Sequence, residues 1–196
     1  MGLRVLLVTG RLRDELTPYL RTLGPIDGLV AENGAVIEVP IGAPPVVIGR
    51  RTAERVRRRL SRHPDLRFRM GEVVASVPRA ERRRLLRAIA GLPVRVVPNV
   101  DRLMVLPNGV DKGSGARRAL RRLGVGRGGY AAIGDAENDV VLLEGAVLSG
   151  AVANAVGRVR RAADYVCRHR YEQGVLEFVR GPLADRLRRP PSGPAA

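Results

Sequence analysis

The chain of 196 residues is long enough to bury one substantial core, or a core with an inserted module. Its 45% hydrophobic, 28% charged and 3% aromatic residues are typical of a globular protein with an aliphatic core, which excludes a disordered or fibrous chain. The formal net charge of +16, carried by 34 arginines and a single lysine, would attract polyanions and makes nucleic acid a rival class of partner.

The start of the chain alternates between apolar runs and helical spacing. Residues 3–8 are an apolar run of strand length, residues 14–23 carry leucines at helical spacing, and residues 28–31 are a second apolar run. The first run is too short to cross a bilayer and lacks the flanks of a secretory signal. Strand, helix and strand in this order predict the opening of a Rossmann-like α/β sheet.

Between residues 37 and 107 the pattern changes. Short strands that contain proline precede a very basic helix over residues 52–62, and a second helix over residues 79–90 is followed by two further strands. This segment predicts a small α/β cap inserted between strands of the larger sheet.

The remainder returns to the pattern of the core. A helix is predicted to begin near Lys112, and the buried strand in "YAAIGD" delivers Asp135 at its carboxyl end. The Pro-rich, polar end predicts a disordered tail. The predicted organisation is a core over residues 1–36 and 108–182, a cap over residues 37–107 and a tail over residues 183–196.

Polar residues gather where predicted strands end or where a helix begins. In open α/β sheets, ligands bind in the crevice at the carboxyl ends of the strands. We therefore expect one site built from Thr9, Gly10, Lys112, Asp135, Asn138 and Asp139.

Asp135 and Asp139 allow two interpretations. They are four residues apart, so a helix starting just after Asp135 would bring both carboxylates near one face, where they suit a Mg²⁺ ion that keeps several waters. In the alternative, Asp135 caps that helix and Asn138 or Asp139 accepts from backbone amides. The sequence leaves both open.

Together the six residues predict phosphoryl chemistry. The Thr9 hydroxyl would donate to a phosphoryl oxygen, and the Lys112 ammonium would offset negative charge on the phosphate and the carboxylates. The single lysine in an arginine-rich chain has two explanations: it survives by chance, or the position needs a compact, strongly hydrated point charge that a planar guanidinium does not replace.

The segments "LLVTGR", "AENGAVI", "VDKGSGARRAL", "IGDAENDVVLL" and "ADYV" followed by "GVLEFV" carry a family resemblance. In this order, and over nearly the whole chain, the sequence resembles the haloacid dehalogenase-like (HAD) phosphatases. The most similar branch has an inserted α/β (type C2B) cap and includes archaeal phosphoglycolate phosphatases and sucrose-phosphate phosphatases. The resemblance implies a Mg²⁺-dependent phosphatase that acts on a small metabolite such as phosphoglycolate or a sugar phosphate.

The resemblance also implies a role for each candidate residue. Thr9 matches the hydroxyl that binds the phosphoryl group, and Lys112 matches the lysine of the third motif. Asp135 and Asp139 match the metal-binding acids, with Asn138 as a supporting member.

One family motif is missing. The DxDGT segment, which supplies the aspartyl nucleophile from a central strand, does not occur in the sequence. Either an upstream segment is missing, which we favour, or the protein lacks the motif by nature. In both cases we expect the first core strand to be absent and the chain to show little phosphatase activity. A non-catalytic protein that binds ligands in the same crevice is the alternative function.

A basic polyanion-binding module is the third alternative. Aromatic side chains that could stack on bases are nearly missing and no known nucleic-acid motif occurs, so we do not expect nucleic acid as a partner. The single cysteine, Cys167, cannot form an internal disulfide and favours the cytoplasm. The arginine-rich helical faces are Arg55, Arg58, Arg59 and Arg62, then Arg83, Arg84 and Arg87, then Arg117, Arg118, Arg121 and Arg122.

Overall fold

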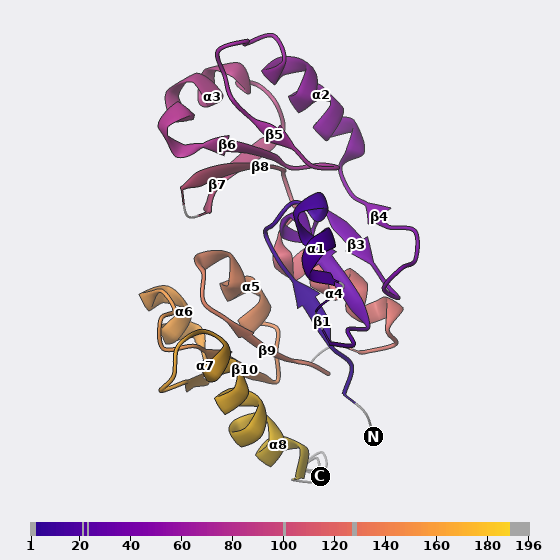
Figure 1. Cartoon of the computed structure of the whole chain (residues 1–196), viewed down its shortest axis with the longest axis vertical. Coiled ribbons are helices and arrows are strands. Elements are labelled where there is room, and N and C mark those ends of the chain that lie inside the picture. The colour runs from indigo at the N-terminus through magenta and orange to yellow at the C-terminus, as the bar shows by residue number, and fades with distance from the viewer. Residues whose placement is uncertain (1–2, 21, 23, 100, 127–128, 189–196) are drawn as a thin grey trace, which may run out of the picture. The chain divides into compact units, whose positions relative to one another are not determined.

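The computed structural model describes residues 3–20, 22, 24–99, 101–126 and 129–188. The chain divides into two compact units, Met1–Gly124 and Val125–Ala196, and the described strands form three sheets (Figure 1). The mixed α/β fold with parallel strands confirms the fold class predicted from the sequence.

The first sheet of unit 1 has the strand order β1-β2-β3-β4. Strands β1 and β2 are parallel, with Leu7 opposite Leu29, and β3 and β4 follow in antiparallel orientation. The sequence placed residues 37–47 in the cap, but β3 pairs with the core strand β2 and β4 pairs with β3, so both strands belong to this sheet rather than to the cap sheet. The elements here are β1 (Leu6–Val8), η1 (Arg13–Leu16), α1 (Thr17–Leu20), β2 (Gly28–Ala31), η2 (Glu32–Gly34), β3 (Val36–Glu38) and β4 (Val46–Val47).

Helix α4 (Lys112–Arg122) covers one face of this sheet. Ala119 of α4 is fully buried in a cluster with Val30 and Ile37 of the sheet, and the partly buried Leu6 and Val8 pack against that cluster. The helix therefore places its first residue near the ends of β1 and β2.

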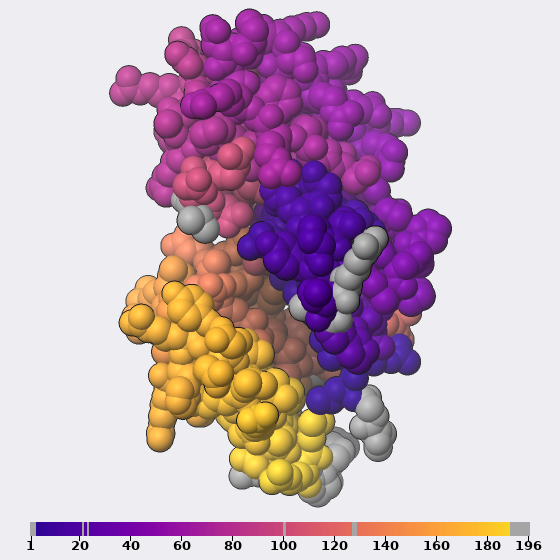
Figure 2. Space-filling view, viewed as in Figure 1, coloured from indigo at the N-terminus to yellow at the C-terminus, as the bar shows by residue number. Residues whose placement is uncertain are grey.

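The cap forms a second, antiparallel sheet with the strand order β5-β6-β8-β7. Helices α2 and α3 lie together on one side of it (Figure 1), where they bury Val56 and Leu85 against Leu103 and Val105 of β8. Long side chains project from the cap surface in the space-filling view (Figure 2). The cap elements are α2 (Arg50–Leu60), β5 (Arg69–Met70), β6 (Ala75–Pro78), η3 (Arg79–Glu81), α3 (Arg82–Ala88), β7 (Val94–Asn99) and β8 (Arg102–Pro107).

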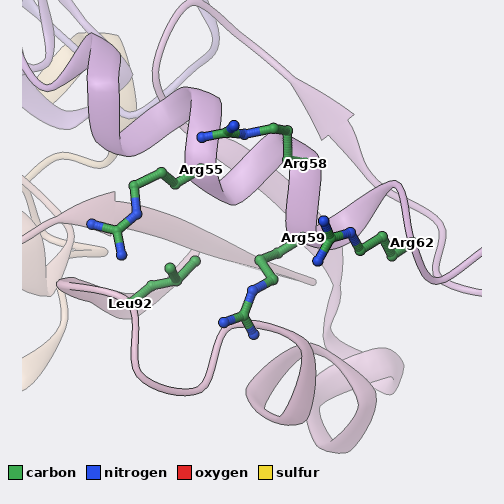
Figure 3. A pocket seen from close by; sticks show the side chains of 5 residues that line it. All are labelled: Arg55, Arg58, Arg59, Arg62 and Leu92. Atoms are coloured by element: carbon green, nitrogen blue, oxygen red, sulfur yellow. The ribbon is translucent and has the colours of Figure 1, made fainter.

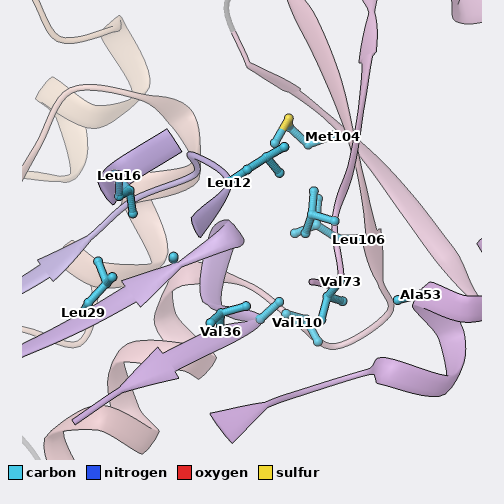
Figure 4. Packing of buried hydrophobic residues seen from close by; sticks show 12 residues of the cluster. Leu12, Leu16, Leu29, Val36, Ala53, Val73, Met104, Leu106 and Val110 are labelled. Atoms are coloured by element: carbon cyan, nitrogen blue, oxygen red, sulfur yellow. The ribbon is translucent and has the colours of Figure 1, made fainter. Parts of the chain in front are cut away.

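The opposite face of the cap sheet packs on the first part of the chain. Met104 and Leu106, which alternate along β8 with the residues beneath the helices, belong to a cluster with Leu12 and Leu29 (Figure 4). Each face of β8 therefore has its own apolar core, one beneath the cap helices and one toward the first sheet.

Unit 2 contains a parallel sheet with the strand order β11-β10-β9. Val159 of α6 and Ala151 of β10 lie in its apolar core. The elements are β9 (Ala131–Gly134), η4 (Glu137–Asp139), α5 (Val140–Leu143), β10 (Leu148–Ala151), α6 (Gly157–Ala162), β11 (Tyr165–Val166), α7 (Tyr171–Phe178), the π-helix η5 (Val179–Leu183) and α8 (Ala184–Arg188).

Three parallel strands have a partner on one side only within the described residues. Strand β1 pairs with β2, and β9 and β11 each pair with β10. Strands β1 and β9 are apolar and half-buried, whereas parallel strands are ordinarily enclosed. The absence of a core strand from the sequence stays a prediction.

The predicted tail begins as a helix. Helix α8 occupies residues 184–188, with Asp185 in the first turn and Arg188 in the last, which suits the helix dipole. Arg188 Nη1 lies 3.5 Å from Asp185 Oδ1. The rest of the predicted tail, residues 189–196, lies outside the described residues. Across the described residues, no helix is both long and apolar enough to cross a membrane.

Candidate functional site

The loop after β1 holds Thr9 and Gly10. The Thr9 amide donates to the Val30 carbonyl at 2.8 Å, and the Thr9 hydroxyl oxygen accepts from the Arg11 amide at 3.2 Å. Gly10 is buried, and a Cβ there would lie 3.1 Å from the side-chain amide of Asn33. The absence of a side chain at position 10 thus lets Asn33 pack against the loop.

The segment Glu32–Gly34 connects this loop to the end of β2. The Asn33 amide donates to the Thr9 carbonyl and the Glu32 amide donates to the Arg11 carbonyl, both at 3.0 Å. Glu32 and Asn33 have φ angles of 52° and 54°, which non-glycine residues adopt only when surrounding contacts hold them. The hydrogen bonds to the Thr9 and Arg11 carbonyls therefore fix the backbone conformation of Glu32 and Asn33.

Lys112 is the first residue of α4. Asp111 caps the helix by accepting from the Ser114 amide at 2.6 Å, while the Ser114 hydroxyl accepts from the Asp111 amide at 2.9 Å. The Lys112 side chain is buried, with 7% of the residue exposed. A buried ammonium at the positive end of a helix requires polar or anionic surroundings.

Two glycines set the position of the α4 start. A Cβ on Gly34 would collide with the Asp111 carbonyl, and a Cβ on Gly115 would collide with Gly34. Because both lack side chains, the first turn of α4 rests directly on the Glu32–Gly34 segment, which is bonded to the Thr9 loop. Unit 1 thus brings the Thr9 loop and the Lys112 helix start to the same segment.

Unit 2 holds the acidic residues. One oxygen of Asp139, Oδ2, accepts from the amides of Asp135 and Ala136 at 3.1 and 3.0 Å, and Gly134 leaves room for this side chain. Asp139 is buried, whereas the Asp135 side chain is exposed and Asn138 is half-buried. The capping interpretation is confirmed for Asp139, but the N-cap of η4 is Ala136 rather than Asp135.

The fit to Mg²⁺ rests on these two carboxylates. The Asp139 bonds fix the loop that presents Asp135, and an exposed carboxylate at a strand end suits an ion that keeps several waters. Among the described residues, no group of three or more acidic, histidine or cysteine side chains could hold a metal. Two acids therefore supply only part of a ligand set.

The candidate residues are divided between the two units. Thr9, Gly10 and Lys112 belong to Met1–Gly124, and the acidic residues belong to Val125–Ala196. Their meeting in one crevice stays a prediction.

Glu32 is a residue that the sequence interpretation missed. Its fully buried carboxylate accepts from the amides of Glu72, Val73 and Val74 at 2.8–2.9 Å and from that of Arg13 at 3.4 Å. The partners of its shortest bonds lie about forty positions away, so no local spacing indicates them. The sequence does offer one sign of its role: Glu32 lies between the apolar run of residues 28–31 and the Asn33-Gly34 turn.

Glu177 links the two C-terminal segments that carry the family resemblance, "ADYV" and "GVLEFV". Hydrogen bonds from the Arg168 amide, the His169 ring and the Tyr165 hydroxyl lower the pKa of Glu177 to about 2. In turn, the bond to Glu177 raises the pKa of Tyr165. The bonds that Glu177 of α7 accepts from Tyr165, Arg168 and His169 thus hold α7 at the end of β11.

Known proteins provide an independent comparison. A family model described as haloacid dehalogenase-like hydrolase matches residues 97–179. A phosphoglycolate phosphatase from Halorubrum lacusprofundi is 36% identical over 195 residues, covering 92% of this chain and 82% of the relative. Another, from Archaeoglobus fulgidus, is 30% identical over 184 residues, covering 89% and 81%.

The fold comparison agrees. A crystal structure of a haloacid dehalogenase-like hydrolase from Bacteroides thetaiotaomicron matches with a TM-score of 0.72 and 18% identity, covering 91% of this chain and 86% of the other. The chain belongs to the haloacid dehalogenase-like hydrolases. Within that class it is a phosphatase, which confirms the resemblance read from the sequence.

Proposed function

We propose that this protein is a Mg²⁺-dependent phosphomonoesterase for a small phosphorylated metabolite, with phosphoglycolate as the first candidate substrate. The observation that carries the proposal is the burial of Lys112 at the capped start of α4, which rests on the same segment as the Thr9 loop. The names of the relatives from Halorubrum and Archaeoglobus support the choice of substrate.

In this proposal the three candidate residues of unit 1, Thr9, Gly10 and Lys112, form the binding site for the phosphoryl group. The Thr9 hydroxyl donates to one phosphoryl oxygen, and the Lys112 ammonium neutralises charge that grows on the oxygens during transfer. Gly10 lets Asn33 pack against the loop after Thr9, and in this proposal the backbone of that loop borders the phosphate.

Asp135 and Asp139 would hold the metal, with Asn138 in support. A divalent ion supplies charge neutralisation at the phosphoryl oxygens. Of the two acids, Asp135 contributes an exposed carboxylate, while Asp139 also holds the loop through its bonds to backbone amides. We also propose a cytoplasmic location, on the argument that the single cysteine, Cys167, is buried and forms no disulfide.

The sequence contains no DxDGT segment and therefore no recognisable aspartyl nucleophile. We propose that residues 1–196 alone bind phosphate but hydrolyse esters slowly. The same absence favours the second candidate function, a protein that binds a phosphorylated metabolite without turning it over.

Phosphate binding tests the site directly. Isothermal titration of the full chain with inorganic phosphate and MgCl₂ should show binding that Lys112→Met weakens at least tenfold. Arg117→Met removes one exposed cation from the same helix and should change the affinity less than twofold. Equal weakening by both variants would contradict the proposed site.

Turnover tests the argument from the missing nucleophile. Phosphate release from 2-phosphoglycolate and p-nitrophenyl phosphate should stay far below the roughly 1–1,000 s⁻¹ of ordinary enzymes. Binding without release agrees with slow hydrolysis by residues 1–196 and with the second candidate alike. Release within that range would refute the argument and the second candidate together.

A further inference from the structure

The outer face of α2 carries a pocket lined by four arginines and one leucine. It has a volume of about 140 Å³ and is lined by Arg55, Arg58, Arg59, Arg62 and Leu92. In Figure 3, Arg55 and Arg59 extend from α2 toward the segment that carries Leu92, Arg58 lies along the helix, and Arg62 stands near its C-terminal end. The pocket is smaller than the roughly 300–1,000 Å³ of sites that enclose drug-sized ligands, so it suits a compact ligand.

None of the described ion pairs involves the four arginines of this pocket. The spacing i, i+3, i+4 and i+7 places the four arginines on one face of the helix, along about 10 Å of its axis. Like charges at these spacings destabilise a helix. Within the described part of the chain, the ion pairs of unit 1 involve other arginines, such as Arg69 with Glu15 and Arg84 with Glu81.

One of the four has a protein acceptor. Arg59 Nη1 donates to the Ala88 carbonyl at 3.5 Å, which directs this side chain toward the end of α3. All four arginines line the pocket, Arg55 and Arg59 extend toward the segment that carries Leu92, and none of them forms a described ion pair with an acid.

The pocket lies on the far side of the cap sheet from the Thr9 loop. Val56 and Leu60 of α2 pack on the β8 face that carries Leu103 and Val105. The other face of β8 packs with Leu12, close after the loop. The arginine pocket is therefore a different site from the one proposed for phosphate transfer.

The lining selects the class of ligand. A guanidinium presents parallel N–H donors that match the oxygens of phosphate in bidentate fashion, and four in a row suit several linked phosphates. No aromatic side chain lines the pocket, so it offers no platform for a base. We propose that this pocket binds a compact polyphosphate group, either free inorganic polyphosphate or the phosphate tail of a nucleotide.

The test is titration of the full chain with sodium tripolyphosphate. Arg55→Gln/Arg59→Gln should weaken binding at least tenfold, and Arg58→Gln/Arg62→Gln provides an independent second pair. The matched control, Arg82→Gln/Arg83→Gln, removes the same charge from exposed positions of α3 and should weaken binding less than threefold. Equal weakening by all three double variants would mean general charge attraction and would overturn the proposal.

Further titrations distinguish free polyphosphate from a nucleotide, and the arginine pocket from the site around Lys112. ATP that binds as tightly as tripolyphosphate supports recognition of the phosphates alone, and tighter binding of ATP supports a nucleotide. Loss of tripolyphosphate binding in Lys112→Met, with no effect of the α2 variants, would overturn this proposal while supporting the proposed function. Tighter binding of a single-stranded oligonucleotide, abolished by the α2 variants, would instead assign the surface to nucleic acid.

Discussion

Glu32→Gln should destabilise unit 1 strongly, although the substitution changes a single atom. The Glu32 carboxylate is fully buried, and its two oxygens share four backbone N–H donors. A glutamine keeps one oxygen, which can accept from two of those amides. Its NH₂ group would face the other two, so that donors oppose donors in a site without water-exposed surface.

The expected cost follows from these contacts. Two hydrogen bonds to a charged acceptor are lost, each contributing about 1.5–3 kcal/mol, which gives a total of about 3–6 kcal/mol. This is a large part of the roughly 5–15 kcal/mol that stabilises an ordinary domain. For a chain of this length it corresponds to a decrease in the melting temperature of about 6–24 °C.

Urea unfolding and hydrogen exchange check the prediction together. The variant should lose exchange protection at the amides of Val73 and Val74, which donate to Glu32. The control is Glu72→Gln on the same segment, whose half-exposed carboxylate lies 3.9 Å from Arg50 and should contribute under about 1 kcal/mol. A loss below about 1 kcal/mol in Glu32→Gln, with Val73 and Val74 still protected, would refute the reasoning.

Three further predictions concern other parts of the chain. Gly115→Ala should cost about 1–3 kcal/mol because its methyl group would push the start of α4 off the neighbouring segment, whereas Gly126→Ala meets nothing within 4 Å; thermal unfolding compares the two. Asp139→Ala should lower stability by about 1–3 kcal/mol through two unpaired amides. Asp135→Ala should leave stability unchanged but weaken Mg²⁺ binding in a calorimetric titration, and the reverse pattern would contradict these roles. Because the folded-state pKa of Glu177 is about 2 against an ordinary 4.5, its stabilisation is present above pH 4.5 and is lost as the pH falls toward 2; melting temperatures between pH 6 and 3 should fall less in Glu177→Gln than in the natural chain.

The sequence predicted local features well because their causes are local. The apolar run at residues 28–31 is strand β2 with the same limits, and α4 begins at Lys112 because Asp111 caps it. The hairpin of β3 and β4 was assigned to the wrong sheet, since partner choice depends on which strand lies alongside. Glu32 was missed for the same reason: the amides of Glu72 to Val74 are brought to it only by the tertiary fold.

Lys112 is the single lysine of the chain, and it lies at a buried position. Among the residues that the structure describes, the buried charged side chains include Lys112 and no arginine. A chain that uses arginine on its surface kept an ammonium at the position where the cation is enclosed, at the first residue of a helix whose dipole disfavours it. A wide guanidinium carries five donors that would each need an acceptor in that space, whereas an ammonium needs three. The presence of lysine rather than arginine at this position therefore follows from the limited number of acceptors that the enclosed space can offer.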